Sequence, residues 1–428
     1  MSNGIADRGE STRSSDPVLA SNGRPNLVRE RERIVERIKH LRPETDAYAT
    51  EFVDQVLQFA STVKTSDIHL QPTSSGLEVK FRVDGVLQQL GEFPVGASSS
   101  IVSRLKVISN LLTYRSDMPQ EGRIETPNEG TEVRVSTYPT LHGERGVLRF
   151  FGHGHQYQQL EDLGHTEEIL NSLRECLSET SGAVLICGPA GSGKSTTLYA
   201  SLRHLVDQTK GSRNLMSLED PIEVPIPGVS QSQVNDGAGF DLHVGLRSLL
   251  RQDPEVIMVG EIRDPVTAAI AIQASLTGQL MLTSFHADSA VVAVSRLLDL
   301  GIEPYLLKSG ILGICCQRLL RRLCECSTEC DSPSEFYGLP IDRCRVPGKC
   351  ELCNDTGYRG RVIASEFLSL RDAVLADQLL DTQDARKSYR MAVENGMKSI
   401  WERATDLVRE GVTSPLEVRR VLGATMRI

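Results

Sequence analysis

A glycine-rich octapeptide, Gly188-Pro-Ala-Gly-Ser-Gly-Lys-Ser195, constrains the fold of this chain more than any other feature. It matches the pattern GxxxxGK(S/T) in full, follows the apolar run 183–187 and precedes a helical pattern that starts near Lys194. In this context the glycines let backbone N–H groups turn towards phosphate oxygens, and the helix N-terminus adds positive potential. A chance glycine-rich turn is the alternative, but the flanking strand and helix argue against it. The sequence therefore predicts a phosphate site inside an α/β sheet.

Every residue of this loop is a candidate nucleotide contact. The Lys194 ammonium would reach the β- and γ-phosphates, and the Ser195 hydroxyl would bind Mg²⁺. The remaining candidates lie around the phosphates, where all except the proline can offer a backbone N–H group, and they are Gly188, Pro189, Ala190, Gly191, Ser192, Gly193 and Thr196.

Hydrolysis also needs a carboxylate that orients water, and two acidic segments are available. Glu261 follows the apolar run 256–259, so a strand beside the loop strand would bring Glu261 to the carboxyl edge of the sheet. Many P-loop enzymes have Asp before this Glu, whereas this chain has Gly260. The second segment also follows an apolar strand and could supply outer contacts of the metal or simply cap helices; its carboxylates are Glu219, Asp220 and Glu223.

Length and charge limit the possible classes. At roughly 150 residues per domain, 428 residues predict about three domains. The formal net charge of −9 argues against a surface built for nucleic acid, so none is expected as a partner. No apolar run approaches the roughly 18 residues of a membrane-spanning helix, and the N-terminus lacks the apolar core of a secretory signal. We expect a cytoplasmic protein that reaches a membrane only at its surface.

Six of the ten cysteines fall between Cys324 and Cys353, which indicates a metal rather than disulfides in a reducing compartment. Cys350-Glu-Leu-Cys353 is a CxxC pair, and all-thiolate tetrahedral sites favour structural Zn²⁺. Four of five candidate cysteines are expected to bind the ion, and Cys344 is a further possible ligand. The alternative is that these cysteines are free thiols. The five candidates are Cys324, Cys326, Cys330, Cys350 and Cys353. The other four are expected in apolar cores, namely Cys176, Cys187, Cys315 and Cys316.

The order of these motifs resembles that of the type II secretion and type IV pilus assembly ATPases. The matching core segments are the phosphate loop and residues 218–223, 260–264 and 282–288. Similar segments lie earlier and later in the chain, at residues 66–70, 82–87, 119–123, 134–139, 143–149, 357–361 and 396–401. The resemblance covers about residues 48 to 425.

The resemblance and the residue pattern together predict an α/β fold with a RecA-like P-loop core. The expected divisions are a disordered tail at 1–25, a helical linker at 26–44, a PAS-like α+β module at 45–152, the core at 166–310, a cysteine-rich zinc subdomain at 311–370 and a C-terminal helical region at 371–428. The helical pattern after Asn26, a candidate N-cap, fits either a partner-docking helix or one packed on its own domain.

What the resemblance implies is a hexameric ring ATPase that uses ATP and Mg²⁺. Hydrolysis would move the first module against the core and drive an inner-membrane platform that assembles pilin or pseudopilin subunits. Glu261 would polarise water, Glu219 and Asp220 would support the metal, and His286 would sense the γ-phosphate. Four arginines lie in segments that supply phosphate contacts in the family, and they are Arg123, Arg134, Arg145 and Arg149.

Several departures from the family pattern keep other interpretations open. Gln279 and Gln71 stand where the family commonly has His and Glu, and the cysteine spacing differs. Only about 45 residues precede the first module, so we expect the long N-terminal docking domain of many members to be missing. The alternatives are a pilus-retraction motor, which the cysteine pair disfavours, a nucleic-acid-translocating ring and a non-hydrolysing nucleotide-gated scaffold.

Overall fold

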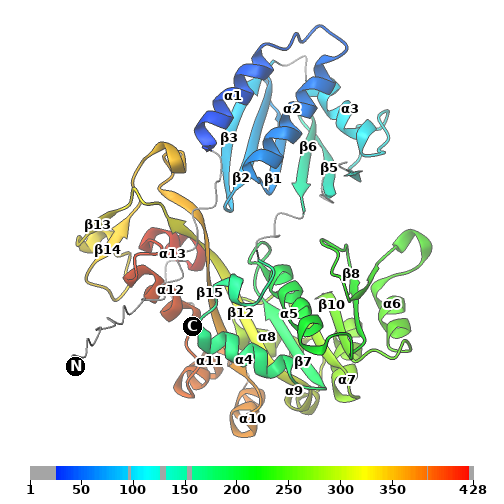
Figure 1. Ribbon diagram of the computed structural model, residues 1–428, viewed down its shortest axis with the longest axis vertical. Coiled ribbons are helices and arrows are strands. Elements are labelled where there is room, and N and C mark those ends of the chain that lie inside the picture. The colour runs from blue at the N-terminus through cyan, green and yellow to red at the C-terminus, as the bar shows by residue number, and fades with distance from the viewer. Residues whose placement is uncertain (1–25, 95–97, 126–131, 152–156, 383, 424–428) are drawn as a thin grey trace, which may run out of the picture.

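The computed structural model describes residues 26–94, 98–125, 132–151, 157–382 and 384–423. The predicted disordered tail at 1–25 lies outside these ranges. The described residues form two large sheets and one small one. Figure 1 shows the first sheet with its helices at one end of the molecule and the core sheet at the other, with the cysteine-rich segment beside the last two helices.

The first module is a six-stranded antiparallel sheet with helices packed on it. Its order is β3-β2-β1-β6-β5-β4, and its strands are β1 (Asp67–Pro72), β2 (Leu77–Val83), β3 (Val86–Phe93), β4 (Gln120–Glu125), β5 (Glu132–Thr140) and β6 (Gly143–Phe150). Its helices are α1 (Leu27–Lys39), α2 (Tyr48–Val63) and α3 (Ser98–Ile108). Alternation of apolar residues gives β2 one buried face, against which Phe59 of α2 packs edge-on to Phe81 at 5.1 Å between ring centroids.

Helix α1 packs on its own module. The Asn26 side chain accepts a hydrogen bond from Arg29 N at 3.2 Å, which confirms Asn26 as the N-cap. Ile34 and Ile38 are buried in the core that α2 shares with the sheet. Of the two expected roles for this helix, packing on its own domain is the one that the contacts support.

The core is a seven-stranded, mostly parallel sheet, as predicted. Its order is β15-β12-β7-β11-β10-β8-β9, and only β15 runs antiparallel to its neighbour. The strands are β7 (Gly182–Cys187), β8 (Leu215–Glu219), β9 (Ser230–Gln233), β10 (Val256–Ile262), β11 (Leu280–Phe285), β12 (Ile311–Leu323) and β15 (Tyr358–Ser369). The last two join this sheet although they fall in the range expected as the cysteine-rich subdomain, because their apolar residues extend the core.

Helices cover both faces of the core sheet. Leu185 of β7 packs on one face among α6–α11, and the next residue, Ile186, packs on the other face against α4 and α5. Burial on both faces explains why these strands are continuously apolar rather than alternating. The helices are α4 (Glu167–Leu177), α5 (Lys194–Thr209), α6 (Leu242–Leu249), α7 (Pro265–Leu276), α8 (Ala290–Asp299), α9 (Pro304–Gly310), α10 (Ala373–Asp381) and α11 (Ala385–Glu394).

The cysteine-rich segment is an excursion between the antiparallel strands β12 and β15. It contains a two-stranded ribbon of β13 (Thr328–Cys330) and β14 (Cys344–Val346) and the 3₁₀ turn η5 (Glu351–Cys353). The final helices, α12 (Ile400–Arg409) and α13 (Pro415–Leu422), share an apolar cluster with this ribbon and with β12 and β15. The excursion is therefore anchored to the core sheet rather than separate from it.

Candidate nucleotide site and metal centre

The phosphate loop connects two buried elements of the core. Strand β7 is buried at every residue, and α5 begins at Lys194 directly after the loop. At Gly188 the φ angle is +146°, and a Cβ there would lie 2.6 Å from the backbone oxygen of Gln317. Glycine is therefore required here both by conformation and by space.

Two side chains at the start of α5 face this loop and its surroundings. Lys194 Nζ donates hydrogen bonds to the carbonyl oxygens of Gly188 at 2.9 Å and Pro189 at 3.1 Å. Burial lowers the pKa of Lys194, and the negative charge of Glu261 opposes that change. Ser195 Oγ donates to Glu223 Oε1 at 3.0 Å. The lysine and the serine hydroxyl thus lie where a triphosphate and its metal would meet the loop.

Glu261 lies at the carboxyl end of β10, and its carboxylate lies between Arg263 and His286. Arg263 Nε donates to Oε2 at 2.7 Å. His286 Nε2, just beyond β11, lies 2.6 Å from Oε1, although the two groups are not aligned for a hydrogen bond. Strands β10 and β11 are parallel neighbours, which brings these two residues to one sheet edge.

The acidic segment after β8 differs in arrangement from the expectation. Glu219 is 3% exposed, and its carboxylate accepts hydrogen bonds from Tyr199, Ser217 and Gln231. It therefore braces the sheet against α5. Asp220 points elsewhere, with one carboxylate oxygen 3.8 Å from an Arg263 nitrogen.

Glu223 is the carboxylate of this segment that faces the phosphate loop. It bonds the loop serine, and burial raises its pKa. The resemblance assigns metal support to Glu219 and Asp220, whereas the turn after β8 decides which carboxylate faces the loop.

Gln317 lies at the site although no motif in the sequence marks it. Its amide donates to Ser192 O at 2.9 Å, and its carbonyl accepts from Thr197 Oγ1 at 3.0 Å, so it joins the loop to the first turns of α5. The next residue, Arg318, donates to the backbone oxygen of Asp288 at 2.9 Å. Gln317 and Arg318 are two adjacent polar residues in the buried part of β12, and such a pair indicates that both side chains have specific partners.

The four candidate arginines lie on strands β4, β5 and β6 of the first module. Arg145 Nη2 lies 2.8 Å from His69 Nδ1, and Arg149 Nε donates to Asp67 at 3.0 Å. Arg123 and Arg134 face each other across the β4–β5 register. The positive charge of Arg134 also lowers the pKa of Glu223, opposing the effect of burial, so Arg134 lies near the acidic side of the nucleotide site.

Gln279 lies at the opposite edge of the core sheet. It precedes β11, whereas the phosphate loop follows the other end of the parallel strand β7. At about 3.3 Å per residue, β11 separates Gln279 from that edge by roughly 20 Å. Its side chain accepts from Thr277 Oγ1 at 2.9 Å in the turn after α7. Gln279, which replaces the family's common His, is therefore too far from the phosphate loop of the same chain to contact a nucleotide bound there.

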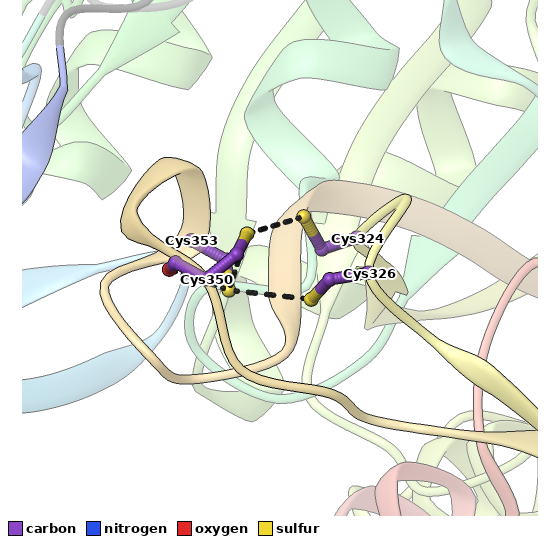
Figure 2. A group of neighbouring side chains, drawn as sticks. All are labelled: Cys324, Cys326, Cys350 and Cys353. Atoms are coloured by element: carbon purple, nitrogen blue, oxygen red, sulfur yellow. Dashed lines mark hydrogen bonds between the residues drawn. The ribbon is translucent and has the colours of Figure 1, made fainter.

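Among the described residues, four cysteine sulfurs gather within 4.8 Å of one another, from Cys324, Cys326, Cys350 and Cys353. The sulfurs of Cys324 and Cys350 lie 3.7 Å apart, those of Cys326 and Cys353 3.7 Å apart, and those of Cys350 and Cys353 3.6 Å apart. Figure 2 shows the four side chains pointing towards one another. Zn–S bonds of about 2.3 Å in a tetrahedron place the sulfurs about 3.8 Å apart. Disulfide bonds would require about 2 Å. The donor set thus fits one tetrahedral thiophilic ion.

The remaining cysteines lie outside this group. Cys330, the fifth candidate, lies in β13 directly opposite Cys344 of β14. The prediction that the other four are core residues is confirmed, since all of them are buried; they are Cys176, Cys187, Cys315 and Cys316.

The excursion that carries the four cysteines also touches the first module through residues near Cys353 and at the start of β15. Asn354 Nδ2 donates to Gln88 Oε1 of β3 at 2.7 Å, and Gly360 N donates to Asp84 Oδ2 at 2.8 Å. A cavity of about 50 Å³ lies at the same junction, lined by Leu27 and Cys353 among other residues. The cysteine cluster therefore sits where the first module meets the core.

The fold and the loop together define a P-loop nucleotide hydrolase with a RecA-like core. Residues 43–420 match the family described as "Type II/IV secretion system protein". The chain belongs to this family and is an ATPase. Of the described residues, no helix combines the length and apolar character needed to cross a membrane.

Three similar proteins illustrate this membership. The type II secretion system ATPase E of Vibrio cholerae serotype O1 is 40% identical over 391 residues, covering 89% of this chain and 76% of the relative. The type IV pilus assembly ATPase PilB of Thermus thermophilus is 35% identical over 384 residues, covering 87% and 43%. The Legionella pneumophila ATPase DotB shares the fold with a TM-score of 0.63 at 21% identity, covering 86% and 95%.

Proposed function

We propose that this ATPase binds ATP with Mg²⁺ at the phosphate loop and hydrolyses it to drive assembly of pilin or pseudopilin subunits. The names of its relatives support this role, because one is a type II secretion ATPase and another a type IV pilus assembly ATPase. Hydrolysis would move the first module against the core, and the junction between them would transmit the movement.

In this proposal each loop residue has a chemical role. Lys194 binds the β- and γ-phosphates, and Ser195 with Glu223 holds Mg²⁺, which neutralises phosphate charge. Glu261 orients the attacking water, while Arg263 and His286 fix its carboxylate. Arg134 of the first module supplies positive charge on the far side of the nucleotide.

We extend the proposal to the assembly. The working form is a homo-hexameric ring on the cytoplasmic face of the inner membrane, held there by a membrane platform protein. In such a ring, strands β4, β5 and β6 of each first module would present their arginines to a nucleotide site. Nucleic acid is not expected as a partner because the chain is acidic overall.

One observation carries the proposal: Lys194 and Glu261 converge at one sheet edge. They come from β7–α5 and β10, more than 60 residues apart in the chain, yet the Glu261 charge raises the pKa of Lys194 against the larger lowering by burial. A phosphate-binding lysine next to a water-orienting carboxylate is what phosphoryl transfer to water requires.

The experiment compares Lys194→Ala with Lys398→Ala, a change at an exposed lysine remote from the loop. ATP binding and steady-state hydrolysis are measured with Mg²⁺ on the full chain. We expect Lys194→Ala to abolish turnover and Lys398→Ala to leave it unchanged. Undiminished turnover in Lys194→Ala would refute the phosphate site, and stimulation of the unaltered protein by DNA or RNA would favour a translocase.

The assembly role needs a test in cells. A strain that lacks the chain should fail to assemble pilin-like fibres, and the unaltered gene should restore them while Lys194→Ala should not. Restoration by Lys194→Ala would mean that fibre assembly does not depend on hydrolysis here.

We further propose that Zn²⁺ occupies the cluster of Cys324, Cys326, Cys350 and Cys353. With four protein thiolates the site is closed, so the ion would be structural and would fix the loop that contacts the first module.

A further inference from the structure

Two cysteines outside the metal cluster face each other across the β13–β14 ribbon. Cys330 and Cys344 are direct partners in the antiparallel register. Directly opposed residues in such a pair have Cα atoms about 4.5 or 5.5 Å apart, and both values lie within the range of disulfide-bonded cysteines. Their Cβ atoms need to approach by at most about 1 Å to form a bond.

The two thiols differ in exposure and in reactivity. Cys330 is partly exposed, whereas Cys344 is buried against Phe336 and Leu339. Burial, the neighbouring Cys330 and the Glu335 carboxylate raise the pKa of Cys344 to about 11. Cys344 therefore stays protonated at neutral pH, and an external oxidant meets Cys330 first.

Cys330 and Cys344 lie on the same two segments of the excursion as the four clustered cysteines. In chain order, Cys324 and Cys326 precede β13, and Cys350 and Cys353 follow β14. A metal bound by these four cysteines would join the two arms of the excursion on one side of the ribbon, and a bond between Cys330 and Cys344 would join the same two arms at the ribbon itself.

We propose that Cys330 and Cys344 form a reversible disulfide that keeps the two arms of the metal loop joined. A small-molecule disulfide such as oxidised glutathione is the oxidant. The Cys330 thiolate attacks it and releases one glutathione thiol, leaving a mixed disulfide on Cys330. Cys344 loses its proton and attacks the Cys330 sulfur, releasing the second glutathione. The protein loses two electrons and two protons, and oxidised glutathione becomes two reduced molecules.

The test uses the metal-loaded full chain, equilibrated with mixtures of reduced and oxidised glutathione. Free thiols are trapped with iodoacetamide, and peptides are analysed by mass spectrometry beside the metal content. We expect a Cys330–Cys344 cross-link in oxidising mixtures, a loss of two free thiols per chain and unchanged metal content. The absence of this cross-link in the most oxidising mixture would overturn the proposal, as would oxidation that joins ligand cysteines and releases the metal.

Two single-cysteine variants test the order of attack separately, through the site of the glutathione adduct. Cys344→Ser removes the second thiol, so a stable glutathione adduct should accumulate on Cys330. Cys330→Ser should retain the metal and carry no adduct on the buried Cys344. An adduct on Cys344, or none on Cys330 in the Cys344→Ser protein, would contradict the assigned order of attack.

Discussion

His286 Nε2 lies 2.6 Å from Glu261 Oε1, and the two residues come from the ends of neighbouring parallel strands. The other carboxylate oxygen accepts from Arg263. Glu261 is only 16% exposed, and its negative charge opposes the lowering of the Lys194 pKa by burial. A carboxylate fixed in this way can orient water without paying for reorganisation during the reaction.

The first prediction concerns Glu261→Gln. The amide keeps the shape of the side chain but cannot accept a proton from water, so hydrolysis should fall by about 100-fold or more. ATP binding, measured with a fluorescent analogue, should stay close to the unaltered value. Equal losses of binding and turnover would assign Glu261 a structural role instead.

The second prediction concerns Glu223 and pH. Burial raises the pKa of Glu223 above 4.5, so the folded chain retains a proton that the unfolded chain releases first. Its contribution to stability is therefore complete below pH 4.5 and is lost as pH rises through the folded pKa. Glu223→Gln should be more stable than the unaltered protein at pH 7, and this difference should vanish below pH 4.5.

Thermal unfolding across that range provides the measurement, with the exposed Glu410→Gln as control. The same Glu223→Gln protein should need more Mg²⁺ for half-maximal turnover. A variant that is less stable at pH 7 and unchanged in Mg²⁺ dependence would show that Glu223 is a structural carboxylate.

The third prediction concerns the metal. Elemental analysis should find about one zinc per chain, and Cys350→Ser should abolish it because a four-thiolate site cannot close with three. Cys330→Ser is the matched control and should retain the ion. Removal of zinc by a chelator should lower thermal stability while ATP binding persists, since the loop at Lys194 is braced by Gln317 and not by the cluster. Full zinc content in Cys350→Ser would mean that the ligand set is different.

The fourth prediction concerns Gln279→His, which restores the family's common residue. Because Gln279 lies at the far end of the sheet from the phosphate loop, turnover by the full chain should change by less than about twofold. A large gain in turnover would show that this edge meets a nucleotide site on another subunit.

Much of the core could be predicted because its signals are local. The octapeptide at 188–195, the apolar strand before it and the helix after it specify one another through neighbouring residues. Continuous apolar strands alternating with helices likewise predicted the parallel sheet. The placement of β12 and β15 in that sheet could not be predicted in this way, because the cysteine-rich excursion separates them.

By itself the sequence determined the class of fold, the phosphate loop, the placement of Glu261 at the end of a strand and the presence of a cysteine-rich excursion, since each depends on residues adjacent in the chain. Tertiary structure alone decided that Glu223 rather than Glu219 meets Ser195, and that Cys330 faces Cys344 instead of the metal ligands. These choices depend on which turns and strand edges meet across the fold. Packing of segments that are distant in the chain determines these contacts, and no local sequence periodicity predicts them.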